Sequence, residues 1–357
     1  MNIAITSQNL NPKIVVSGIS TVVATIIKLS HNNLFFYEMG YRDGESKNFK
    51  WLLKQIKFIF HFPFFLLKNN IDLVHLNVPF DTMGIIREYM ALLLSKLVGK
   101  KILLHIHGGK LLMIPAKGKL ILFLIKRILN DSNVVLVLSQ IEKDILNNNY
   151  NFNKAKVLLN AVDTSTIEFN QYKNAKDKVH VLYMARITES KGIDDLIVAF
   201  RQLYPISPFK FFLCGTGSEK EYLISCCQEI FGDDFVYKGV VSGSEKWNVI
   251  ASSDIFILPS RHSEGLPMSL LETMAAGLVP IVTDEASMKY VVTPGINGVR
   301  VKKYNGLDIC NKLNIIMNDH KMMMKFSKAA RQTVEREYDT ISYINKLDEI
   351  YYLLYNS

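Results

Sequence analysis

The stretch DIFILPSRHSEGLPMSLLETMAAGLVPIVTD, residues 254–284, is the part of the chain that predicts its fold most directly. It begins as an apolar strand, passes through a polar turn with Gly-Leu-Pro, and continues as an apolar helix before a second strand. Two apolar strands joined by a helix are typical of a βαβ unit with parallel strands. The stretch also places Glu264 before the helix and Glu272 inside it, with no basic residue between them.

The same alternation extends along the whole chain, in two runs separated by the polar stretch 160–178. Strand-like segments of the first run are NIAITS, NLFFYEM, DLVHLNV, KKILLHIH and NVVLVLS, and those of the second include VHVLYMA, FKFFLCG and DFVYKGV. Strands that alternate with helices predict an α/β fold of two doubly wound, parallel-sheet domains. We expect the domains over 1–165 and 166–340, with a C-terminal helix over 341–357 that packs back on the first.

Composition indicates a folded chain that is long enough for two cores. Of the 357 residues, 49% are hydrophobic and 21% charged. The four Cys have no framework spacing, so we expect buried free thiols in a reducing compartment. The opening MNIAIT resembles a strand rather than a signal peptide, and no uncharged apolar run is long enough for a transmembrane helix.

Positive charge is concentrated in the first half. Residues 1–165 contain 20 of the 42 Lys and Arg but only 10 of the 33 Asp and Glu, which gives +10 there and −1 in the remainder. The excess indicates either an anionic partner, such as a membrane surface, a phosphorylated acceptor or nucleic acid, or a solvated basic face. Aliphatic-rich basic stretches argue against nucleic acid. Segments 48–68 and 110–129 interleave Lys with apolar residues, as in helices that lie on an anionic membrane, or in core helices with snorkelling Lys.

Several residues that could bind a phosphorylated ligand follow predicted strands. In YMARITESKG, Arg186 and Lys191 bring two cations to a helix start, a suitable place for a diphosphate. Backbone amides at the start of the 268 helix suit the same anion, whereas Glu264 beside them would need a neutral hydroxylated group. Glu272 would then accept from a ribose diol. The alternative is that Glu264 only complements the helix dipole and that Glu272 is a solvated helix residue.

These motifs, with CGTGSE, VYKGVV and GINGVRV, resemble the retaining glycosyltransferases of family four, over nearly the whole chain. The resemblance implies the GT-B fold, in which two Rossmann-like domains face each other across a cleft. It implies that Arg186 and Lys191 bind the donor diphosphate, that Glu264 holds hydroxyls of the donor sugar, and that His107 contacts the transferred sugar. It assigns further contacts with the nucleotide sugar to Gly18, Gly215, Gly217, Gly239, Val240, Gly265, Leu266, Met268 and Glu272.

The chain departs from the family pattern at a few positions. Ala185 and Ala161 stand where the family commonly has Gly, and Gly18 is a single glycine where two often occur. Lys289 replaces an acidic residue that often follows the segment ending in Asp284. The single first-loop glycine makes the Gly18 contact the least certain of the assignments.

The absence of an Asp-x-Asp motif favours a metal-independent reaction, in which fixed cations and helix dipoles stabilise the leaving diphosphate. The resemblance implies hexosyl transfer with retention from a nucleotide sugar, which we expect to be a UDP-sugar, to a saccharide acceptor, with no cofactor. The excess of cations and apolar residues in the first half leads us to expect that this acceptor is lipid-linked. A surface-polysaccharide pathway such as O-antigen or lipopolysaccharide synthesis, at the cytoplasmic inner face of the membrane, is the expected setting. Alternatives are a nucleotide-sugar 2-epimerase of the same fold and a non-catalytic nucleotide-sugar-binding subunit.

Two further histidines, His75 and His105, lie within apolar predicted strands. We expect both to be packed core histidines whose ring nitrogens have hydrogen-bond partners, and neither to be catalytic.

Overall fold

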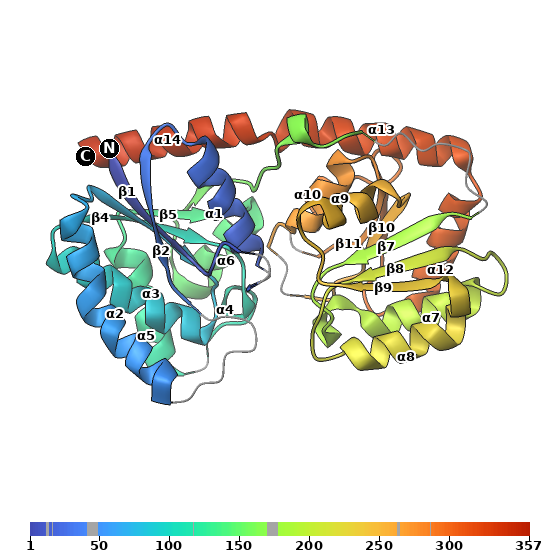
Figure 1. The fold of residues 1–357 in the computed structure, drawn as a ribbon, viewed down its shortest axis with the longest axis horizontal. Coiled ribbons are helices and arrows are strands. Elements are labelled where there is room, and N and C mark those ends of the chain that lie inside the picture. The colour runs from blue at the N-terminus through green and yellow to red at the C-terminus, as the bar shows by residue number, and fades with distance from the viewer. Residues whose placement is uncertain are drawn as a thin grey trace. The chain divides into compact units, whose positions relative to one another are not determined.

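The computed structural model describes residues 1–11, 14–15, 17–40, 49–116, 118–169, 178–262, 265–285 and 287–357. Glu264 therefore lies outside the described residues. The chain divides into two compact units (Figure 1). The first unit comprises residues 1–160 and 341–357, and the second comprises residues 161–340.

The first unit is built on a parallel sheet with the strand order β2-β1-β3-β4-β5-β6. Its strands are β1 (Asn2–Ser7), β2 (Asn33–Glu38), β3 (Leu73–Val78), β4 (Lys101–Ile106), β5 (Val134–Val137) and β6 (Lys156–Val157). Its helices are α1 (Gly18–Leu29), α2 (Phe49–Lys68), α3 (Thr82–Leu97), α4 (Lys110–Met113), α5 (Lys119–Asp131), α6 (Gln140–Tyr150) and α14 (Thr340–Asn356).

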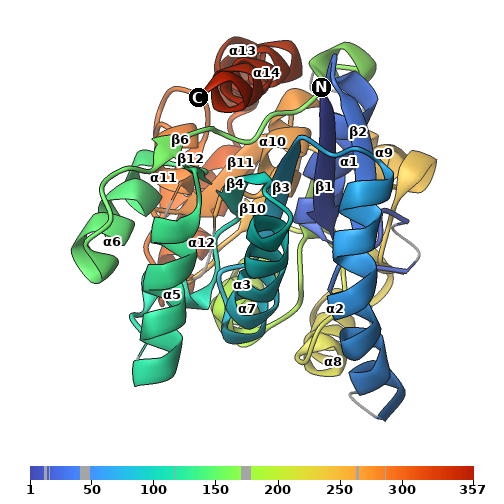
Figure 2. The ribbon, with the colours of Figure 1, turned by 90° about the vertical axis from the view of Figure 1, so that its left-hand side faces the viewer.

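Helices α2, α3 and α5 lie side by side on one face of this sheet (Figure 2). Alternate residues of each strand point to opposite faces, so Val74 and Leu76 of β3 join Leu104 of β4 in the core beneath these helices. The intervening positions, including His75 and His105, point to the other face. There α14 approaches the sheet, and its buried Tyr351 contacts His75.

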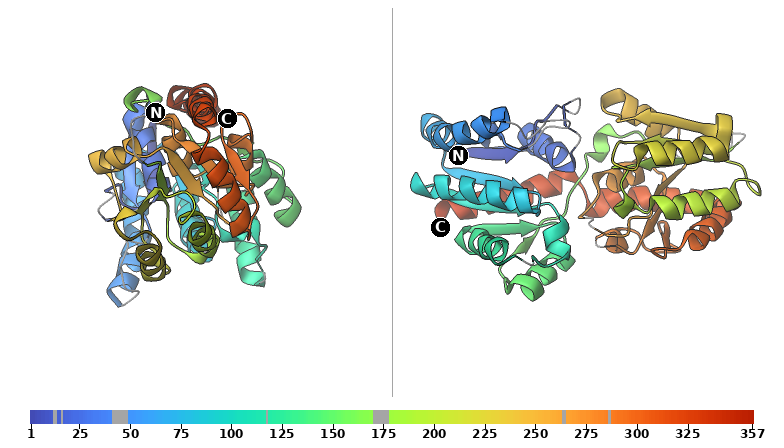
Figure 3. Two further views of the ribbon diagram at one scale, coloured as in Figure 1. Left: turned by 90° about the vertical axis from the view of Figure 1, so that its right-hand side faces the viewer. Right: turned by 90° about the horizontal axis from the view of Figure 1, so that it is seen from below.

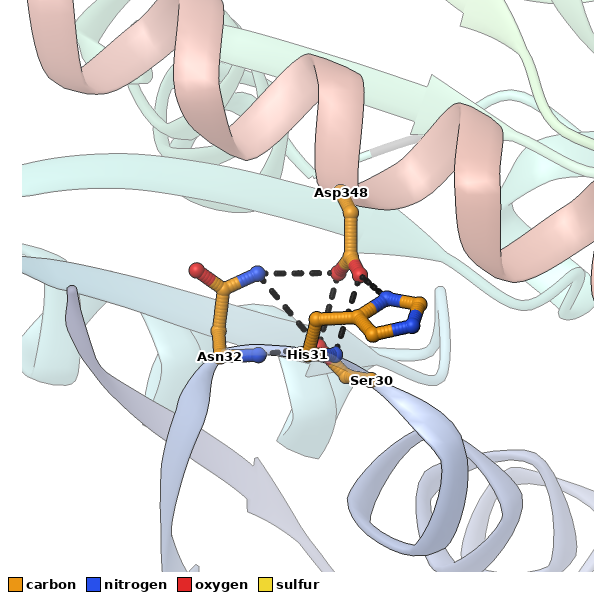
Figure 4. Close-up of polar contacts among 4 residues, drawn as sticks. All are labelled: Ser30, His31, Asn32 and Asp348. Carbon is orange, nitrogen blue, oxygen red and sulfur yellow. Dashed lines mark hydrogen bonds and ion pairs between the residues drawn. The ribbon is translucent and has the colours of Figure 1, made fainter.

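A carboxylate attaches α14 to the loop that follows α1 (Figure 4). Asp348 accepts hydrogen bonds from the hydroxyl of Ser30 at 2.7 Å, the backbone N–H of His31 at 3.1 Å and the side-chain amide of Asn32 at 2.9 Å. His31 Nδ1 lies 3.1 Å from the same carboxylate. The segment that completes the first unit is thus held by specific polar contacts as well as by packing.

The second unit repeats the architecture, with a parallel sheet of order β12-β11-β10-β7-β8-β9. Its strands are β7 (His180–Met184), β8 (Lys210–Cys214), β9 (Phe235–Gly239), β10 (Ile255–Leu258), β11 (Val279–Thr283) and β12 (Val299–Val301). Its α-helices are α7 (Ile193–Leu203), α8 (Lys220–Phe231), α9 (Gly243–Ala251), α10 (Met268–Ala275), α11 (Met288–Val291), α12 (Gly306–Met317) and α13 (His320–Glu337). Its 3-10 turns are η1 (Thr164–Thr166), η2 (Glu189–Lys191) and η3 (Gly232–Asp234).

Helices α7, α8 and α12 lie together on one side of this sheet, and α10 packs with α13 on the other (Figures 1 and 3). Arg331 of α13 donates to the carbonyl oxygens of Thr164 and Ile167 at 2.9 Å, and to that of Ala275 at 2.6 Å. One guanidinium therefore links α13 to the end of α10 and to the first residues of the unit.

The doubly wound α/β fold expected from the sequence is confirmed in both units. The four cysteines are free and buried, and all of them belong to the second unit. No helix in the described part of the chain combines the length and apolar character that crossing a bilayer requires.

Candidate functional site

The loop that carries Arg186 is joined to the glycine loop after β8. The Ile187 N–H donates to the Thr216 carbonyl at 2.9 Å, and the Ile187 carbonyl accepts from Glu219 N–H at 3.1 Å. A Cβ at Gly217 would lie 2.0 Å from that same carbonyl oxygen, so only glycine fits this close approach. The exposed Arg186 side chain is therefore presented from a loop whose backbone is held on both sides.

The glycine loop is joined in turn to the end of β9. Gly215 N–H donates to the Gly239 carbonyl at 2.6 Å, and the Tyr237 hydroxyl donates to the Gly215 carbonyl at 2.9 Å. Val240 follows directly and is exposed. Gly215, Gly217, Gly239 and Val240 thus lie with Arg186 at the carboxyl ends of three adjacent strands, where ligands bind in sheets of this kind.

Lys191 ends the 3-10 turn η2, which packs against the end of β10. The residue after it, Gly192, has φ +73°, and a Cβ there would lie 2.2 Å from the Pro259 carbonyl oxygen. Arg261 N–H donates to the Ser190 carbonyl at 2.8 Å. These contacts place the half-buried Lys191 beside residues 259–262, which follow β10.

The side chain of Arg261 reinforces this junction, although nothing in its sequence context singled it out. Its Nε donates to Asp195 of α7 at 2.9 Å, and its guanidinium lies 4.7 Å from the centroid of the Tyr304 ring. The Asp195 carboxylate raises the pKa of Arg261 above its ordinary value. Arg261 is therefore a fixed cation that supports the Lys191 turn through its backbone.

Gly265, Leu266 and Met268 lie at the start of α10, as expected. Leu266 is buried, Pro267 is the N-cap, and no side chain caps the helix. The N-cap Pro267 supplies no side-chain acceptor to the first-turn N–H groups, and the helix dipole adds positive potential there. The helix start can therefore accept an anionic group.

Glu272 is an ion-paired, buried residue. Its side chain accepts a hydrogen bond from Lys246 Nζ of α9 at 2.8 Å, and only 6% of the residue is exposed. The alternative of a solvated helix residue is therefore wrong. No basic residue lies between Glu264 and Glu272, and the partner comes from α9, the helix before β10, which explains why sequence reasoning missed Lys246.

The first unit holds the two remaining site residues. Gly18 is the exposed first residue of α1, and Ser17, its N-cap, makes no side-chain capping bond. His107 comes directly after β4, and its backbone N–H donates to the Val78 carbonyl at 3.0 Å. Both residues lie at carboxyl ends of strands in the same parallel sheet.

The His107 ring is held by a partner from the neighbouring strand. Its Nε2 lies 2.7 Å from Oδ1 of Asn77, and its ring centroid lies 4.1 Å from that of His105. Burial among these groups lowers the pKa of His107 to about 3, so the imidazole is neutral at neutral pH. A neutral imidazole at a strand end suits a hydroxyl group better than an anion.

The expectation that His75 and His105 have satisfied ring nitrogens is wrong for His105. Its side chain is fully buried, and neither ring nitrogen has a hydrogen-bond partner among the described residues. His75 is half satisfied, because Nδ1 is bonded to the Tyr351 hydroxyl at 2.6 Å while Nε2 has no partner. Burial lowers the pKa of His75 to about 3 and that of His105 well below its ordinary value.

The described site residues thus form two groups, one in each unit. The second unit brings together cations, backbone amides and a paired carboxylate, which suits a nucleoside diphosphate. The first unit contributes a helix start and a neutral histidine. The group in the second unit can bind an anionic ligand, and the group in the first unit can bind a hydroxylated ligand.

Comparison with protein families matches residues 164–333 to Glycosyl transferases group 1. Among curated proteins, the chain is 25% identical over 295 residues to an uncharacterized 41.2 kDa protein in the cps region of Klebsiella pneumoniae, with 79% of each chain covered. It is 27% identical over 159 residues to the N,N'-diacetylbacillosaminyl-diphospho-undecaprenol alpha-1,3-N-acetylgalactosaminyltransferase of Campylobacter jejuni, covering 44% of this chain and 41% of that protein.

Among solved structures, sucrose-phosphate synthase from Thermosynechococcus elongatus has the same fold, with a TM-score of 0.80, 18% identity and 99% of both chains covered. HepE of Anabaena, solved in complex with UDP-glucose, has a TM-score of 0.77 at 15% identity and covers 98% of this chain and 99% of its own. At these identities the structural likeness bears on the fold alone.

Proposed function

We propose that this chain, which matches Glycosyl transferases group 1 over residues 164–333 and has the GT-B fold, transfers a hexose, with retention, from a UDP-sugar to a lipid-linked saccharide acceptor. The reaction belongs to the synthesis of a surface polysaccharide. The observation that carries the donor half of this proposal is the set of backbone contacts that fixes the Arg186 loop against Gly217 and the Lys191 turn against Pro259 and Arg261.

Arg186 and Lys191 bind the donor diphosphate and stabilise the charge that develops on the leaving nucleotide. The amides of Gly265, Leu266 and Met268 complete the anion site. Charge-assisted hydrogen bonds and oriented amides of this kind act most strongly when they are fixed before the reaction. The contacts of the Arg186 loop with Gly217, and of the Lys191 turn with Pro259, supply that fixation.

Glu272 binds the ribose diol, and Lys246 holds its carboxylate in place through an ion pair. Lys246 Nζ contacts Oε1, which leaves Oε2 as the acceptor for a ribose hydroxyl. Glu264 holds hydroxyls of the donor sugar, and this role remains a proposal from its sequence motif alone. His107 contacts the transferred sugar from the first unit.

The fixed cations of the second unit can neutralise the diphosphate, which supports a metal-independent reaction. We assign no protein nucleophile, so retention would follow from attack by the acceptor on the same face that the nucleotide leaves. The nucleotide site can be tested by thermal unfolding with UDP, GDP, ADP and NAD and with UDP- and GDP-sugars, all in the presence of EDTA. A ligand at about 100 times its Kd adds roughly 2.7 kcal/mol to the native state.

The expected result is stabilisation by UDP and UDP-sugars, unchanged by EDTA and lost in Lys191→Ala. The matched control is Lys328→Ala, which removes an exposed cation from α13 of the same unit. Stabilisation that requires a divalent cation would contradict metal independence, and stabilisation by NAD alone would contradict the nucleotide-sugar proposal.

The acceptor half of the proposal is supported by the outer surface of the first unit. Helix α3 exposes an apolar stripe along its length, formed by Met83, Ile86, Met90, Leu93 and Leu97. Their spacing of three and four residues places them on one face of the helix. Such a stripe turned to solvent indicates a contact surface.

The neighbouring helices extend this stripe and add charge. Phe60 and Phe64 of α2 are 75% and 60% exposed, and Leu120 and Phe123 of α5 are 68% and 56% exposed. Exposed lysines accompany them, including Lys57, Lys68, Lys96, Lys119 and Lys126. Apolar side chains mixed with lysines fit the interface of an anionic bilayer, where a lipid-linked acceptor would be found.

The membrane contact is tested by flotation with vesicles that contain or lack an anionic lipid. We expect co-flotation only with anionic vesicles, and its loss in a Phe60→Ser, Phe64→Ser variant. Ile206→Ser is the matched control, because Ile206 is 74% exposed but belongs to the second unit. Equal flotation of the α2 variant and the wild type would contradict this surface, and no flotation of the wild type would contradict membrane association.

A further inference from the structure

We propose that Asn77 is a positioning residue that holds His107 in the tautomer protonated on Nε2 and so makes His107 Nδ1 a hydrogen-bond acceptor for a hydroxyl of the transferred sugar. The inference rests on the proposed contact between His107 and that sugar. It adds the direction of the hydrogen bond and the residue that sets it.

The argument begins at Thr6 on β1. Asn77 Nδ2 lies 2.9 Å from the backbone carbonyl oxygen of Thr6, and the contact is buried. The two ends of an amide have nearly the same shape, so their neighbours must decide which end is which. A carbonyl oxygen can only accept, and therefore the NH₂ end of Asn77 faces Thr6. The oxygen end consequently faces His107.

The orientation of Asn77 decides the proton position on His107. Oδ1 of Asn77 has no hydrogen to donate, and it lies 2.7 Å from Nε2 of His107. A hydrogen bond at this distance requires the hydrogen to be on Nε2. A neutral imidazole carries one N–H, so Nδ1 has a lone pair. No described residue is hydrogen-bonded to Nδ1, and the His107 side chain is only partly buried.

The surroundings favour this neutral form and hold Asn77 still. The His105 and His107 rings lie with their centroids 4.1 Å apart at an interplanar angle of 38°, so a proton on one ring disfavours a proton on the other. Asn77 is 2% exposed, and its backbone N–H donates to the Thr6 hydroxyl at 3.3 Å. One chain of contacts thus runs from β1 through β3 to β4 and ends at the free lone pair of His107. Sugar hydroxyls are donors that match this lone pair.

The tautomer can be measured directly, by long-range proton–nitrogen NMR correlation on protein labelled with ¹⁵N-histidine. The His107 signals are identified by their loss in His107→Gln. We expect the pattern of the Nε2–H tautomer in the wild type at pH 7 and in Thr6→Val, which removes the Thr6 hydroxyl but keeps the carbonyl that orients Asn77. Asn77→Leu removes the acceptor and is expected to give a mixture of tautomers.

Asn77→Asp provides a second route if Asn77→Leu does not fold. The carboxylate keeps an acceptor for Nε2–H and adds a negative charge, so we expect the Nε2–H tautomer and an upward shift in the pKa at which His107 titrates. A wild-type spectrum of the Nδ1–H tautomer, an Asn77→Leu spectrum equal to the wild type, or an unshifted titration in Asn77→Asp would each overturn the proposal.

Kinetics separate this inference from the role proposed for His107. Partners that orient a histidine typically affect activity by about 10- to 100-fold. We expect Asn77→Leu to lower kcat by that factor without changing UDP affinity, and Asn77→Asp to recover part of the rate with a shifted pH profile. If the spectra are as expected but His107→Ala transfers sugar at the wild-type rate, the sugar contact is wrong while the positioning of His107 stands.

Discussion

The two units share one architecture but treat their polar side chains in opposite ways. In the second unit, buried carboxylates near the proposed site are paired with cations: Asp195 with Arg261, and Glu272 with Lys246. In the first unit, burial lowers the pKa of His75, His105 and His107 and raises the pKa of Glu142 to about 8, so these groups are neutral at neutral pH. The difference supports our proposal that the second unit binds the anionic diphosphate and the first unit binds uncharged hydroxyls.

The largest expected effect is that of low pH on the stability of the first unit. His75 and His107 have folded pKa values of about 3 against an ordinary 6.5. Between these values the unfolded chain binds more protons than the folded one, so the free energy of unfolding falls as the pH drops from about 6.5 to about 3. We expect a loss of several kcal/mol across this window, measured by urea unfolding at a series of pH values.

Glu142 contributes with the opposite sign and provides the control. Its folded pKa lies above its ordinary value of 4.5, so its contribution to stability is present below about 4.5 and is lost as the pH rises toward 8. Glu142→Gln should remove this alkaline loss and leave the acid loss unchanged. Acid unfolding that began in the second unit would break the comparison.

The next effect concerns the anion site of the second unit. Lys191→Ala would remove the charge-assisted hydrogen bond that we propose to the diphosphate, and such a bond is worth about 1.5–3 kcal/mol. We expect UDP affinity to fall by about 10- to 100-fold in titration calorimetry, with no change in Lys328→Ala. An unchanged affinity in Lys191→Ala would remove the main contrast between the units.

Gly217→Ala tests whether the loops of the second unit need their close approach. The added methyl would meet the Ile187 carbonyl oxygen at 2.0 Å, and overpacking of this kind costs about 1–3 kcal/mol. Because all four cysteines are buried in the second unit, thiol labelling reports its opening. We expect faster labelling and weaker UDP binding. Gly118→Ala is the control, since nothing lies within 4 Å of a Cβ there; equal behaviour of the two variants would contradict the prediction.

His105→Phe should stabilise the first unit. Both ring nitrogens of His105 are buried without a partner, and an unsatisfied buried polar group costs about 1–3 kcal/mol. Phenylalanine keeps the ring shape and removes those nitrogens. We expect a gain of about 1 kcal/mol at pH 7 in urea unfolding and a weaker acid dependence. Destabilisation at pH 7 would mean that the nitrogens make contacts that stabilise the fold.

Asp348→Asn should have the smallest effect. Its carboxylate accepts bonds from the Ser30–Asn32 loop, and it is only partly shielded from water, with 16% of the side chain exposed. We expect a loss of about 1 kcal/mol, confined to the first unit and visible as faster hydrogen exchange in α14. Thiol labelling of the second unit should not change; if it did, the two units would not unfold separately.

Much of the fold could be predicted because local patterns were strong. NIAITS predicts a strand and the residues after Gly-Leu-Pro predict an apolar helix, and β1 and α10 form there. His107 and Arg186 follow predicted strands in the sequence, and this placed both residues correctly at the carboxyl ends of strands. What the sequence could not predict were the long-range partners. Lys246 meets Glu272, and Asn77 meets Thr6 and His107, only because particular helices and strands become neighbours in the folded chain.

The attachment of α14 has a consequence for the order in which the protein is made. Residues 341–357 belong to the first unit, and Tyr351 and Leu347 are buried in it. A ribosome releases residues 1–160 first, then the entire second unit, and only afterwards the helix that covers His75. The first unit to emerge is therefore the last to be completed, and until then its histidine-bearing face remains open to any chaperone that binds nascent chains.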